Sequence, residues 1–401
     1  MKVAIINMIP YGSTGKIMLH LADILRENGI MARTYSTTPY DQKAKKRVEG
    51  LQGHYEWGSF SENKRHYYLG SLLDRNGCFS KRGTKNLIKD LEEFSPDVIH
   101  LHNLHKHCIN LPMLFKYLKK RKRKVVWTLH DCWAFTGHCP NFEMIGCDKW
   151  KTGCYKCSQY KAYPKSYIDR SKSMYKLKKK WFTGIEDMTL VTPSNWLAEL
   201  TRQSFLKEYP VKTINNGIDL STFKPTESDF RERYNLKDKF IILGVAFGWS
   251  KRKGLDVFIE LSKRLDENFQ IVLVGTNENV DKQLPENIIS IHRTQNQLEL
   301  AQIYSAADLL VNPTREDNFP TVNIEALACG TPVVTFNTGG CPEIVDKTCG
   351  SVVEKNDLDA MQSEIIRIKE QRPYSKDACL KRASDFDKKV KFMEYINLYK
   401  E

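Results

Sequence analysis

The stretch TREDNFPTVNIEALACGTPVV, residues 314–334, has the pattern of a loop, a helix and a strand that follow an earlier strand. That earlier strand is expected to end at Pro313, and a polar loop with acids and asparagine follows it. A helix with Glu325 near its start then runs to Gly330, which ends it before the next strand. Loops at the carboxyl ends of strands bind ligands in open α/β sheets, and a carboxylate there can accept bidentate hydrogen bonds from sugar hydroxyls. The stretch therefore predicts a ligand site; a capped helix with solvated acids is the alternative.

The same alternation of strands and helices runs through the whole chain. Expected strands are Val3–Asn7, Thr34–Ser36, Val98–His102, Val125–His130, Leu190–Thr192, Ile241–Val245, Ile271–Gly275, Ile288–His292, Leu309–Asn312 and Val333–Phe336. Expected helices between them include Gly15–Asn28, Leu255–Arg264 and Gln297–Ala306. Several strands are apolar on both faces, as buried parallel strands are. The pattern predicts an α/β protein with doubly wound parallel sheets covered by helices on both sides.

The length of 401 residues suits two domains. We expect a first domain at 1–210, with a cysteine-rich insertion at 132–157, and a second domain at 211–384. The boundary is placed where a short strand leads into the turn-rich segment Asn215–Asp219. The tail at 385–401 is expected to form a helix that packs back on the first domain.

Composition and charge narrow the class of protein. The apolar fraction is 41% and the charged fraction 27%, which excludes a disordered chain or a coiled coil. No apolar run approaches the ~20 residues that cross a bilayer, and Val3–Pro10 lacks the features of a signal peptide, so we expect a cytoplasmic protein. Residues 1–200 hold 34 Lys and Arg against 18 Asp and Glu, whereas residues 201–401 hold 28 against 30. The basic first half is expected to meet something anionic.

Two basic segments in the first half are candidates for that contact. Residues 119–124 are all Lys or Arg, and they lie between an expected helix and the amino end of a strand. Residues 172–182 mix lysines with Met174, Trp181 and Phe182, which is typical of a helix at a membrane interface. A solvated face is the alternative for both. We expect peripheral binding to an anionic membrane, at the inner face of the plasma membrane.

A glycine loop follows the first expected strand. Gly12 and Gly15 let backbone N–H groups approach a ligand, and the helix that begins there favours an anion. A nucleotide-hydrolase phosphate loop requires Gly at position 10 and Ser or Thr at position 17, but this chain has Pro10 and Ile17. That class is excluded, and a tight strand-to-helix turn is the alternative to a ligand loop.

The stretch 314–334 resembles the donor-site signature of glycosyltransferase family four, a retaining family with the GT-B fold. In that family the second acid of the signature, here Glu325, holds the ribose of the nucleotide. Asp317 stands at the first acidic position, which is usually Glu and lies against the donor sugar; neighbouring Glu316 could share that role. Pro320 replaces a glycine that commonly offers an N–H to the sugar, so one donor contact must differ.

Other segments resemble the family in order and spacing. Arg252 and Lys253 correspond to the basic pair that holds the donor diphosphate, although Gly248 stands where the family often has Arg. Segments 216–219 (NGID) and 339–343 (GGCPE) match its interdomain and glycine loops. The donor site implied by this resemblance comprises Gly12, Gly15, Arg252, Lys253, Glu316, Asp317, Asn318, Phe319 and Glu325. A solvated loop is the alternative for the basic pair.

Histidines end two expected strands of the first half. The resemblance implies that His130 points toward the donor sugar, so we take His130, Asp317, Glu325, Arg252 and Lys253 as the catalytic set. His102 and His105 are candidates for the acceptor side. A strand-end histidine that merely satisfies its hydrogen bonds is the alternative for His102 and His105.

Cysteines gather in the insertion. Without an export signal they should be reduced, and Cys139, Cys147, Cys154 and Cys157 have the residue types and spacing of a structural zinc site. Reduced cysteines packed in a loop are the alternative. We expect no catalytic metal or cofactor, because this fold's transferases let basic side chains and dipoles hold the diphosphate.

The resemblance implies a retaining hexosyltransferase with two Rossmann-like domains that face each other across a cleft. Its partners would be a nucleoside diphosphate sugar and a saccharide acceptor, which is often lipid-linked, in the synthesis of capsule, O-antigen or related envelope polysaccharide. The leaving phosphate is held to take the acceptor's proton, so no side-chain base is named. Two alternatives are a sugar-nucleotide epimerase of the same fold and a basic nucleic-acid-binding protein; the second leaves the acidic motif unexplained.

Overall fold

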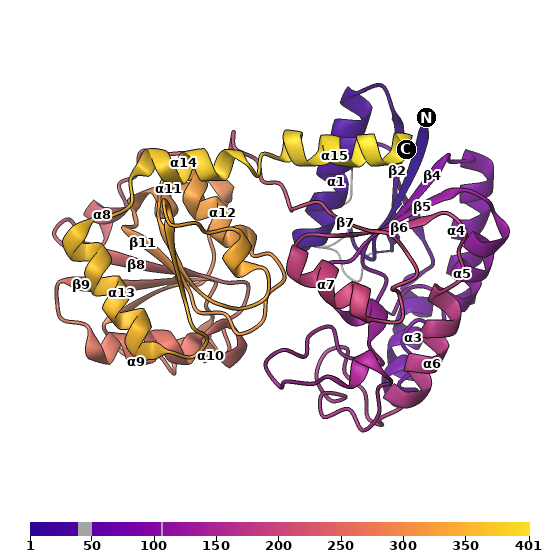
Figure 1. Cartoon of the computed structure of the whole chain (residues 1–401), viewed down its shortest axis with the longest axis horizontal. Coiled ribbons are helices and arrows are strands. Elements are labelled where there is room, and N and C mark those ends of the chain that lie inside the picture. Colours follow the sequence, from indigo (N-terminus) through magenta and orange to yellow (C-terminus); the bar gives the residue numbers. More distant parts are fainter. Residues whose placement is uncertain (39–49, 106) are drawn as a thin grey trace. The chain divides into compact units, whose positions relative to one another are not determined.

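The computed structural model describes residues 1–38, 50–105 and 107–401. The chain divides into two compact units (Figure 1). The first comprises Met1–Ile214 and Phe392–Glu401, and the second comprises Asn215–Lys391. The boundary placed from the sequence, before residue 211, lies four residues earlier than this division.

The first unit is built on a parallel sheet with the strand order β3-β2-β1-β4-β5-β6-β7. Its strands are β1 (Lys2–Ile6), β2 (Met31–Thr37), β3 (His54–Trp57), β4 (Val98–Leu101), β5 (Lys124–Thr128), β6 (Met188–Thr192) and β7 (Val211–Thr213). Its helices are α1 (Gly12–Glu27), α3 (Phe60–Leu73), α4 (Lys81–Phe94), α5 (Leu111–Lys120), α6 (Ser171–Phe182) and α7 (Asn195–Gln203), with short 3-10 turns η1 (Trp133–Phe135) and η2 (Lys149–Lys151). The sequence pattern had not indicated β3.

Both faces of this sheet are buried. Along β1, Ala4 and Ile6 belong to one apolar cluster, while Val3 and Ile5 belong to another, and all four are fully buried. Successive side chains of a strand point to opposite faces, so an uninterrupted apolar run requires a cover on each side. The continuous apolar runs in the sequence have this cause.

The second unit is also a parallel sheet, with the order β10-β9-β8-β11-β12-β13. Its strands are β8 (Phe240–Val245), β9 (Phe269–Val274), β10 (Ile288–Ile291), β11 (Leu309–Asn312), β12 (Val333–Phe336) and β13 (Gly350–Val353). Its helices are α8 (Phe230–Arg233), α9 (Leu255–Arg264), α10 (Glu278–Asp281), α11 (Gln297–Ala306), α12 (Thr321–Ala328), α13 (Leu358–Gln371) and α14 (Lys376–Ser384), with 3-10 turns η3 (Lys251–Lys253) and η4 (Cys341–Glu343). The two sheets confirm the expected doubly wound α/β architecture.

The C-terminal helix α15 (Lys388–Lys400) begins three residues later than the segment 385–401 expected from the sequence. Its last part, from Phe392, belongs to the first unit. There the hydroxyl of Tyr399 lies 2.6 Å from Nδ1 of His100, and the hydroxyl of Tyr395 lies 3.1 Å from Oγ1 of Thr128. The apolar residues of the helix join the cluster on one face of the first sheet.

The expectation that residues 172–182 form a membrane-interface helix is wrong. These residues do form a helix, α6, but Met174 and Phe182 are buried in the protein, where the ring of Phe182 packs against Phe115 and Trp127. Lys178 is fully buried as well, and its Nζ donates to the backbone oxygens of Trp133 and Thr136. The apolar side of α6 therefore covers the sheet and cannot face a bilayer. Among the described residues, no helix is long and apolar enough to cross a membrane.

Candidate active site

Three loops of the second unit meet because two glycines allow close contact. Gly254, which follows η3, has φ +78°, and a Cβ on it would lie 2.5 Å from the backbone oxygen of Pro313, the residue after β11. Gly339, in the loop after β12, has φ +54°, and a Cβ there would lie 1.7 Å from the backbone oxygen of Asp317. Only glycine fits either position. The basic loop after β8, the acidic loop after β11 and the glycine loop after β12 thus gather at the carboxyl end of the sheet.

Charged side chains from two of these loops are in contact. Nζ of Lys253 lies 2.5 Å from Oδ2 of Asp317, and each side chain keeps about a fifth of its surface exposed. Nη1 of Arg252 donates to the backbone oxygen of Glu316 at 3.2 Å. A lysine and an arginine beside an acidic loop can hold an anionic group while carboxylates accept hydrogen bonds from hydroxyls.

Arg315, which the sequence analysis did not select, fastens the acidic loop. Its guanidinium makes a two-pronged contact with Asp256 at 2.7 and 2.9 Å, and its Nε donates to Oδ1 of Asn356 at 2.6 Å. It also donates to the backbone oxygen of Lys251. Because Arg315 is buried, it positions the loops around it instead of presenting its charge to a ligand. In the sequence, only its position directly before Glu316 and Asp317 indicates a role in this site.

Glu325 is on α12, the helix that follows the acidic loop, and lies in the middle of that helix, not near its start as expected. Its Oε2 accepts a hydrogen bond of 3.0 Å from the hydroxyl of Tyr304, a fully buried residue of α11. Burial raises the pKa of the Tyr304 hydroxyl well above its ordinary value, and the carboxylate of Glu325 adds to this effect. The Tyr304 hydroxyl therefore stays protonated, and its hydrogen bond holds one carboxylate oxygen of Glu325 in place.

Two more residues of the acidic loop lie apart from the solvent. The side chain of Phe319 is buried and packs edge-on against Phe386, with ring centroids 5.6 Å apart. The ring anchors the loop in the core, and the donor-binding role expected for Phe319 stays a prediction. Glu316 is also buried, whereas Asn318 is partly exposed.

Histidines of the first unit form a cluster just beyond the ends of β4 and β5. Nδ1 of His102 lies 2.9 Å from Nε2 of His130, and the two rings stack. Burial lowers the pKa of His130 to about 4. Burial also lowers the pKa of His102 well below its ordinary value, with contributions from His100 and His130. These imidazoles are therefore neutral near pH 7 and can exchange hydrogen bonds with an uncharged polar group.

His105 belongs to a neighbouring set of contacts. Its Nε2 lies 2.7 Å from Oδ2 of Asp131, and its Nδ1 lies 3.2 Å from the hydroxyl of Tyr163. Burial alone would raise the pKa of Asp131, but His105 and the backbone N–H of Trp133 lower it overall. The carboxylate therefore stays ionised and orients the His105 ring.

The glycine loop after β1 is held by Asn7, another residue that the sequence analysis did not select. Its Nδ2 donates to the backbone oxygen of Ile9 at 2.8 Å, and its Oδ1 accepts from the N–H of Asn103 at 3.1 Å. Gly15 packs so closely that a Cβ would lie 2.5 Å from the carbonyl carbon of Pro10. Gly12, at the start of α1, has φ +73° and open space around it. Asn7 thus links the loops that follow β1 and β4 at the carboxyl end of the sheet.

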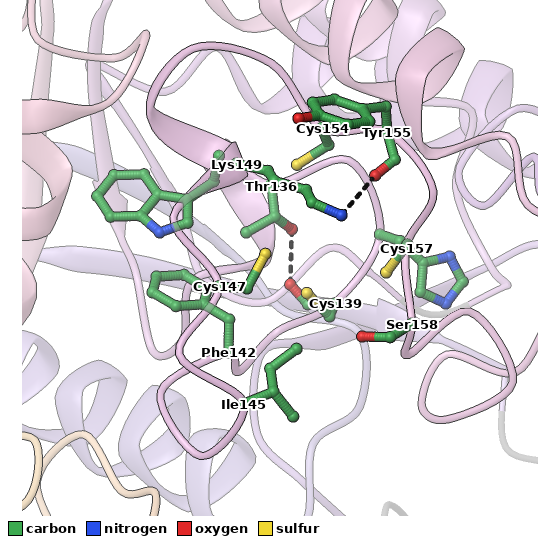
Figure 2. Close-up of a pocket in the computed structure, with 12 residues that line it drawn as sticks. Thr136, Cys139, Phe142, Ile145, Cys147, Lys149, Cys154, Tyr155, Cys157 and Ser158 are labelled. Carbon is green, nitrogen blue, oxygen red and sulfur yellow. Dashed lines mark hydrogen bonds between the residues drawn. The ribbon is translucent and has the colours of Figure 1, made fainter.

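The four cysteines singled out in the insertion line one cavity of the first unit (Figure 2). In the part of the chain that the structure describes, no group of three or more His, Cys, Asp or Glu side chains is already arranged to hold a metal ion.

Two Rossmann-like units with their functional loops at strand ends define a class of ligand-binding α/β proteins, and comparison with known families narrows it. Residues 15–222, more than half of the chain, match the family model described as Glycosyltransferase Family 4. Residues 238–371 match the model described as Glycosyl transferases group 1. The chain belongs to glycosyltransferase family 4, a family of enzymes that transfer sugars.

Two bacterial transferases are similar to this chain, each at 27% sequence identity. The putative colanic acid biosynthesis glycosyl transferase WcaC of Escherichia coli is 27% identical over 273 residues, which cover 66% of this chain and 65% of that protein. The N,N'-diacetylbacillosaminyl-diphospho-undecaprenol alpha-1,3-N-acetylgalactosaminyltransferase of Campylobacter jejuni is 27% identical over 282 residues, 63% of this chain and 72% of that protein.

Solved structures share the architecture at low identity. The crystal structure of Anabaena HepE in complex with UDP has a TM-score of 0.71 and 16% identity, with 99% of each chain covered. The same protein has been solved in complex with UDP-glucose. This likeness confirms the GT-B fold.

Proposed function

We propose that this protein is a retaining glycosyltransferase that moves a hexose from a nucleoside diphosphate sugar to a hydroxyl of a saccharide acceptor. Family membership supports the reaction class. The observation that carries the proposal is the contact of Lys253 with Asp317, at the meeting point of loops that follow β8 and β11. Cations for a diphosphate and a carboxylate for a sugar hydroxyl are both present there.

The donor-site residues have distinct roles in this proposal. Arg252 and Lys253 bind the diphosphate, on which negative charge grows as the sugar departs, so their stabilisation is greatest in the transition state. When the diphosphate takes up Lys253, Asp317 becomes free to accept hydrogen bonds from the donor sugar. Glu325, with one oxygen fixed by Tyr304, accepts from the ribose hydroxyls. Lys253 and Asp317 thus hold each other in place until the donor arrives.

His130 contacts the donor sugar as a neutral hydrogen-bonding group, which its lowered pKa supports. It takes no proton from the acceptor; the leaving phosphate does so, and no side-chain base or catalytic metal is needed. His102 and His105 lie toward the acceptor. HepE binds UDP and UDP-glucose in its crystals, which makes UDP-sugars the first donors to test.

The acceptor is a lipid-linked saccharide of envelope polysaccharide synthesis in this proposal. The names of two relatives support it: one is assigned to colanic acid biosynthesis, and the other acts on a diphospho-undecaprenol saccharide. An enzyme with such an acceptor must work at a membrane surface. Because α6 is excluded from that role, another surface of the basic first unit has to make the contact.

Exposed aromatic and apolar side chains mark such a surface on the first unit. Those on α3 are Phe60, Tyr67, Tyr68 and Leu72, and those on the nearby segment 163–168 are Tyr163, Tyr167 and Ile168. The two segments are adjacent, since the N–H of Tyr167 and the hydroxyl of Ser166 both donate to the backbone oxygen of Ser71. Exposed basic residues accompany them: Lys64, Arg65, Lys161 and Lys165. Tyrosines with nearby cations suit the interface of an anionic membrane.

A binding and activity experiment tests the donor site. Thermal unfolding is followed with UDP, GDP, ADP, CMP and their sugar conjugates, since a ligand at 100 times its Kd stabilises the folded state by about 2.7 kcal/mol. Turnover of the stabilising donor is then measured with lipid-linked acceptors. Lys253→Ala and Glu325→Gln should each lower kcat/KM by about 10²-fold or more. Exposed residues provide matched controls: Lys251→Ala on the same turn and Glu286→Gln.

Near-normal turnover of the Lys253→Ala or Glu325→Gln protein would refute the assigned roles. If the protein interconverted donor sugars in the absence of an acceptor, its function would be that of an epimerase and not of a transferase.

The membrane contact is tested by sedimentation with vesicles of phosphatidylcholine alone or mixed with phosphatidylglycerol. We expect binding to the anionic vesicles only, and a clear loss of binding for the double variant Tyr68→Ser, Leu72→Ser. Tyr234→Ser, which changes an exposed tyrosine of the second unit, is the matched control. Equal binding of all three proteins would exclude this surface.

A further inference from the structure

The insertion that follows β5 surrounds a small cavity. The cavity has a volume of about 30 Å³, room for a single ion or water molecule (Figure 2). Its lining includes Cys139, Cys147, Cys154, Cys157, His138 and Trp150. The four cysteines line one cavity although they are up to 18 positions apart in the chain. Neither the sheet nor the candidate active site requires this arrangement.

The cysteine side chains already contact one another and the backbone. The side chains of Cys139 and Cys157 are hydrogen-bonded to each other. The backbone N–H of Gly137 donates to Sγ of Cys154 at 3.1 Å. A hydrogen bond to an ionised acceptor is stronger than one to a neutral acceptor, so this N–H favours sulfur with negative charge. Gly137 is also packed tightly, since a Cβ on it would lie 2.7 Å from Cβ of Cys154.

A buried histidine gives a second and independent indication. Nδ1 of His138 lies 2.7 Å from Oδ1 of Asp74, and their side chains are only 2% and 4% exposed. Nε2 of the same ring is buried and has no hydrogen-bond partner among the described residues. His138 lines the same cavity as the cysteines, so this polar atom lacks a partner where an occupant would supply one. Asp74 also accepts the N–H of Arg170 at 2.7 Å, which keeps the carboxylate in place.

We propose that this cavity holds one structural zinc ion, with Cys139, Cys147, Cys154 and Cys157 as its four ligands. His138 lies beside these ligands, and Asp74 holds its imidazole ring in place through Nδ1. Four thiolates around Zn²⁺ leave a net charge of −2, which favours the protonated form of the neighbouring, fully buried Lys178.

Zinc binding requires a small local change. The present side-chain positions are not those of a metal site. Zn–S bonds of about 2.3 Å place tetrahedral sulfur atoms about 3.8 Å apart. Rotation about Cα–Cβ moves Sγ alone, so each cysteine can turn toward the cavity while its backbone stays in place. The hydrogen bond between Cys139 and Cys157 is then exchanged for two bonds to the metal, and the four thiols release their protons to solvent as they become thiolates.

The role of the ion follows from the scarcity of regular structure around it. Between β5 and α6 the chain forms only the short turns η1 and η2, so few backbone hydrogen bonds stabilise the insertion. A metal that joins Cys139 to Cys157 would supply folding free energy there. Asp131 immediately precedes the insertion; its Oδ1 accepts the N–H of Trp133, and its other oxygen contacts His105. The zinc would therefore help to hold Asp131 and His105 in place.

Metal analysis of protein purified without a histidine tag tests the proposal. We expect about one zinc per chain, and X-ray absorption at the zinc edge should show four Zn–S distances near 2.3 Å and no Zn–N distance. Cys154→Ser and Cys157→Ser should lose most of the zinc. Cys78→Ser, which changes a partly buried cysteine outside the insertion, should retain it. Removal of the ion with a mercurial reagent should lower the Tm of wild-type protein.

Three results would overturn the proposal. One is folded wild-type protein that contains no zinc and whose four thiols are all free or joined as disulfides. Another is zinc that remains at full stoichiometry in both serine variants. The third is a Zn–N distance, which would replace the four-cysteine ligand set by one that includes His138. Because the zinc content and spectrum are measured on wild-type protein, the test stands even if a variant fails to fold.

Discussion

Replacement of Gly339 by alanine tests whether the glycine loop sets the position of the acidic loop. Gly339 has φ +54°, and a Cβ on it would lie 1.7 Å from the backbone oxygen of Asp317. Real Cβ contacts are essentially never shorter than 3.0 Å, so one loop must move by about 1.3 Å (3.0 − 1.7). The atom that must give way is backbone, which cannot turn aside as a flexible side chain does.

The expected loss is roughly 2–5 kcal/mol in the free energy of unfolding. About 1–2 kcal/mol of this comes from a left-handed conformation in a residue with a Cβ. A further ~1–3 kcal/mol comes from overpacking at a contact that cannot relax freely. Gly248→Ala is the matched control, since Gly248 lies in the same unit with φ +88° and nothing within 4 Å of its Cβ position. It should lose only the strain contribution.

Urea unfolding followed by circular dichroism measures both variants against the wild type. The reasoning predicts that Gly339→Ala is the less stable of the two, and that it also weakens the stabilisation given by the donor nucleotide because Asp317 has moved. Equal unfolding free energies for Gly339→Ala and Gly248→Ala, with unchanged nucleotide stabilisation, would show that the acidic loop is not held by this contact.

Three further outcomes are expected. Arg315→Lys keeps the charge but loses the two-pronged contact with Asp256, so urea titration should show roughly 2–3 kcal/mol lower stability; a change below ~0.5 kcal/mol would contradict its positioning role. Tyr304→Phe removes one hydrogen bond to Glu325, and steady-state kinetics should show a higher KM for the donor with kcat little changed; an unchanged KM would mean that this bond does not orient Glu325. Burial lowers the pKa of His130 to about 4, so the unfolded chain binds its proton first as pH falls below ~6.5. Stability should therefore be full above that pH and decline toward pH 4, and unfolding titrations that show a rise over this range would refute the sign.

The sequence predicted most of the architecture correctly, because the periodicity of strands and helices depends on residues near one another in the chain. Continuous apolar runs identified most of the strands. Gly330 and Gly339 mark turns with a positive φ, which residues with a Cβ rarely adopt. The resemblance carried by these segments led to the family that the comparisons confirm. Prediction was weakest for short edge elements such as β3, whose exposed residues lack the buried pattern.

The α6 segment shows why a correct local pattern can lead to a wrong role. Lysines alternating with Met174 and Phe182 define an amphipathic helix, and that helix exists. The pattern records which side is apolar, not what covers it. The rings of Phe115 and Trp127, far away in the sequence, cover Phe182. Only the packing of distant elements excludes the membrane as its partner.

The amino-acid sequence by itself determined the strand–helix alternation, the two-unit organisation and the motif loops, since each depends on residues near one another in the chain. The tertiary structure decided which side chains meet. It paired Lys253 with Asp317, Arg315 with Asp256, His102 with His130, and His138 with Asp74. These contacts join residues from different loops, and their distances are set by how the sheets bring strand ends together, which no local pattern encodes.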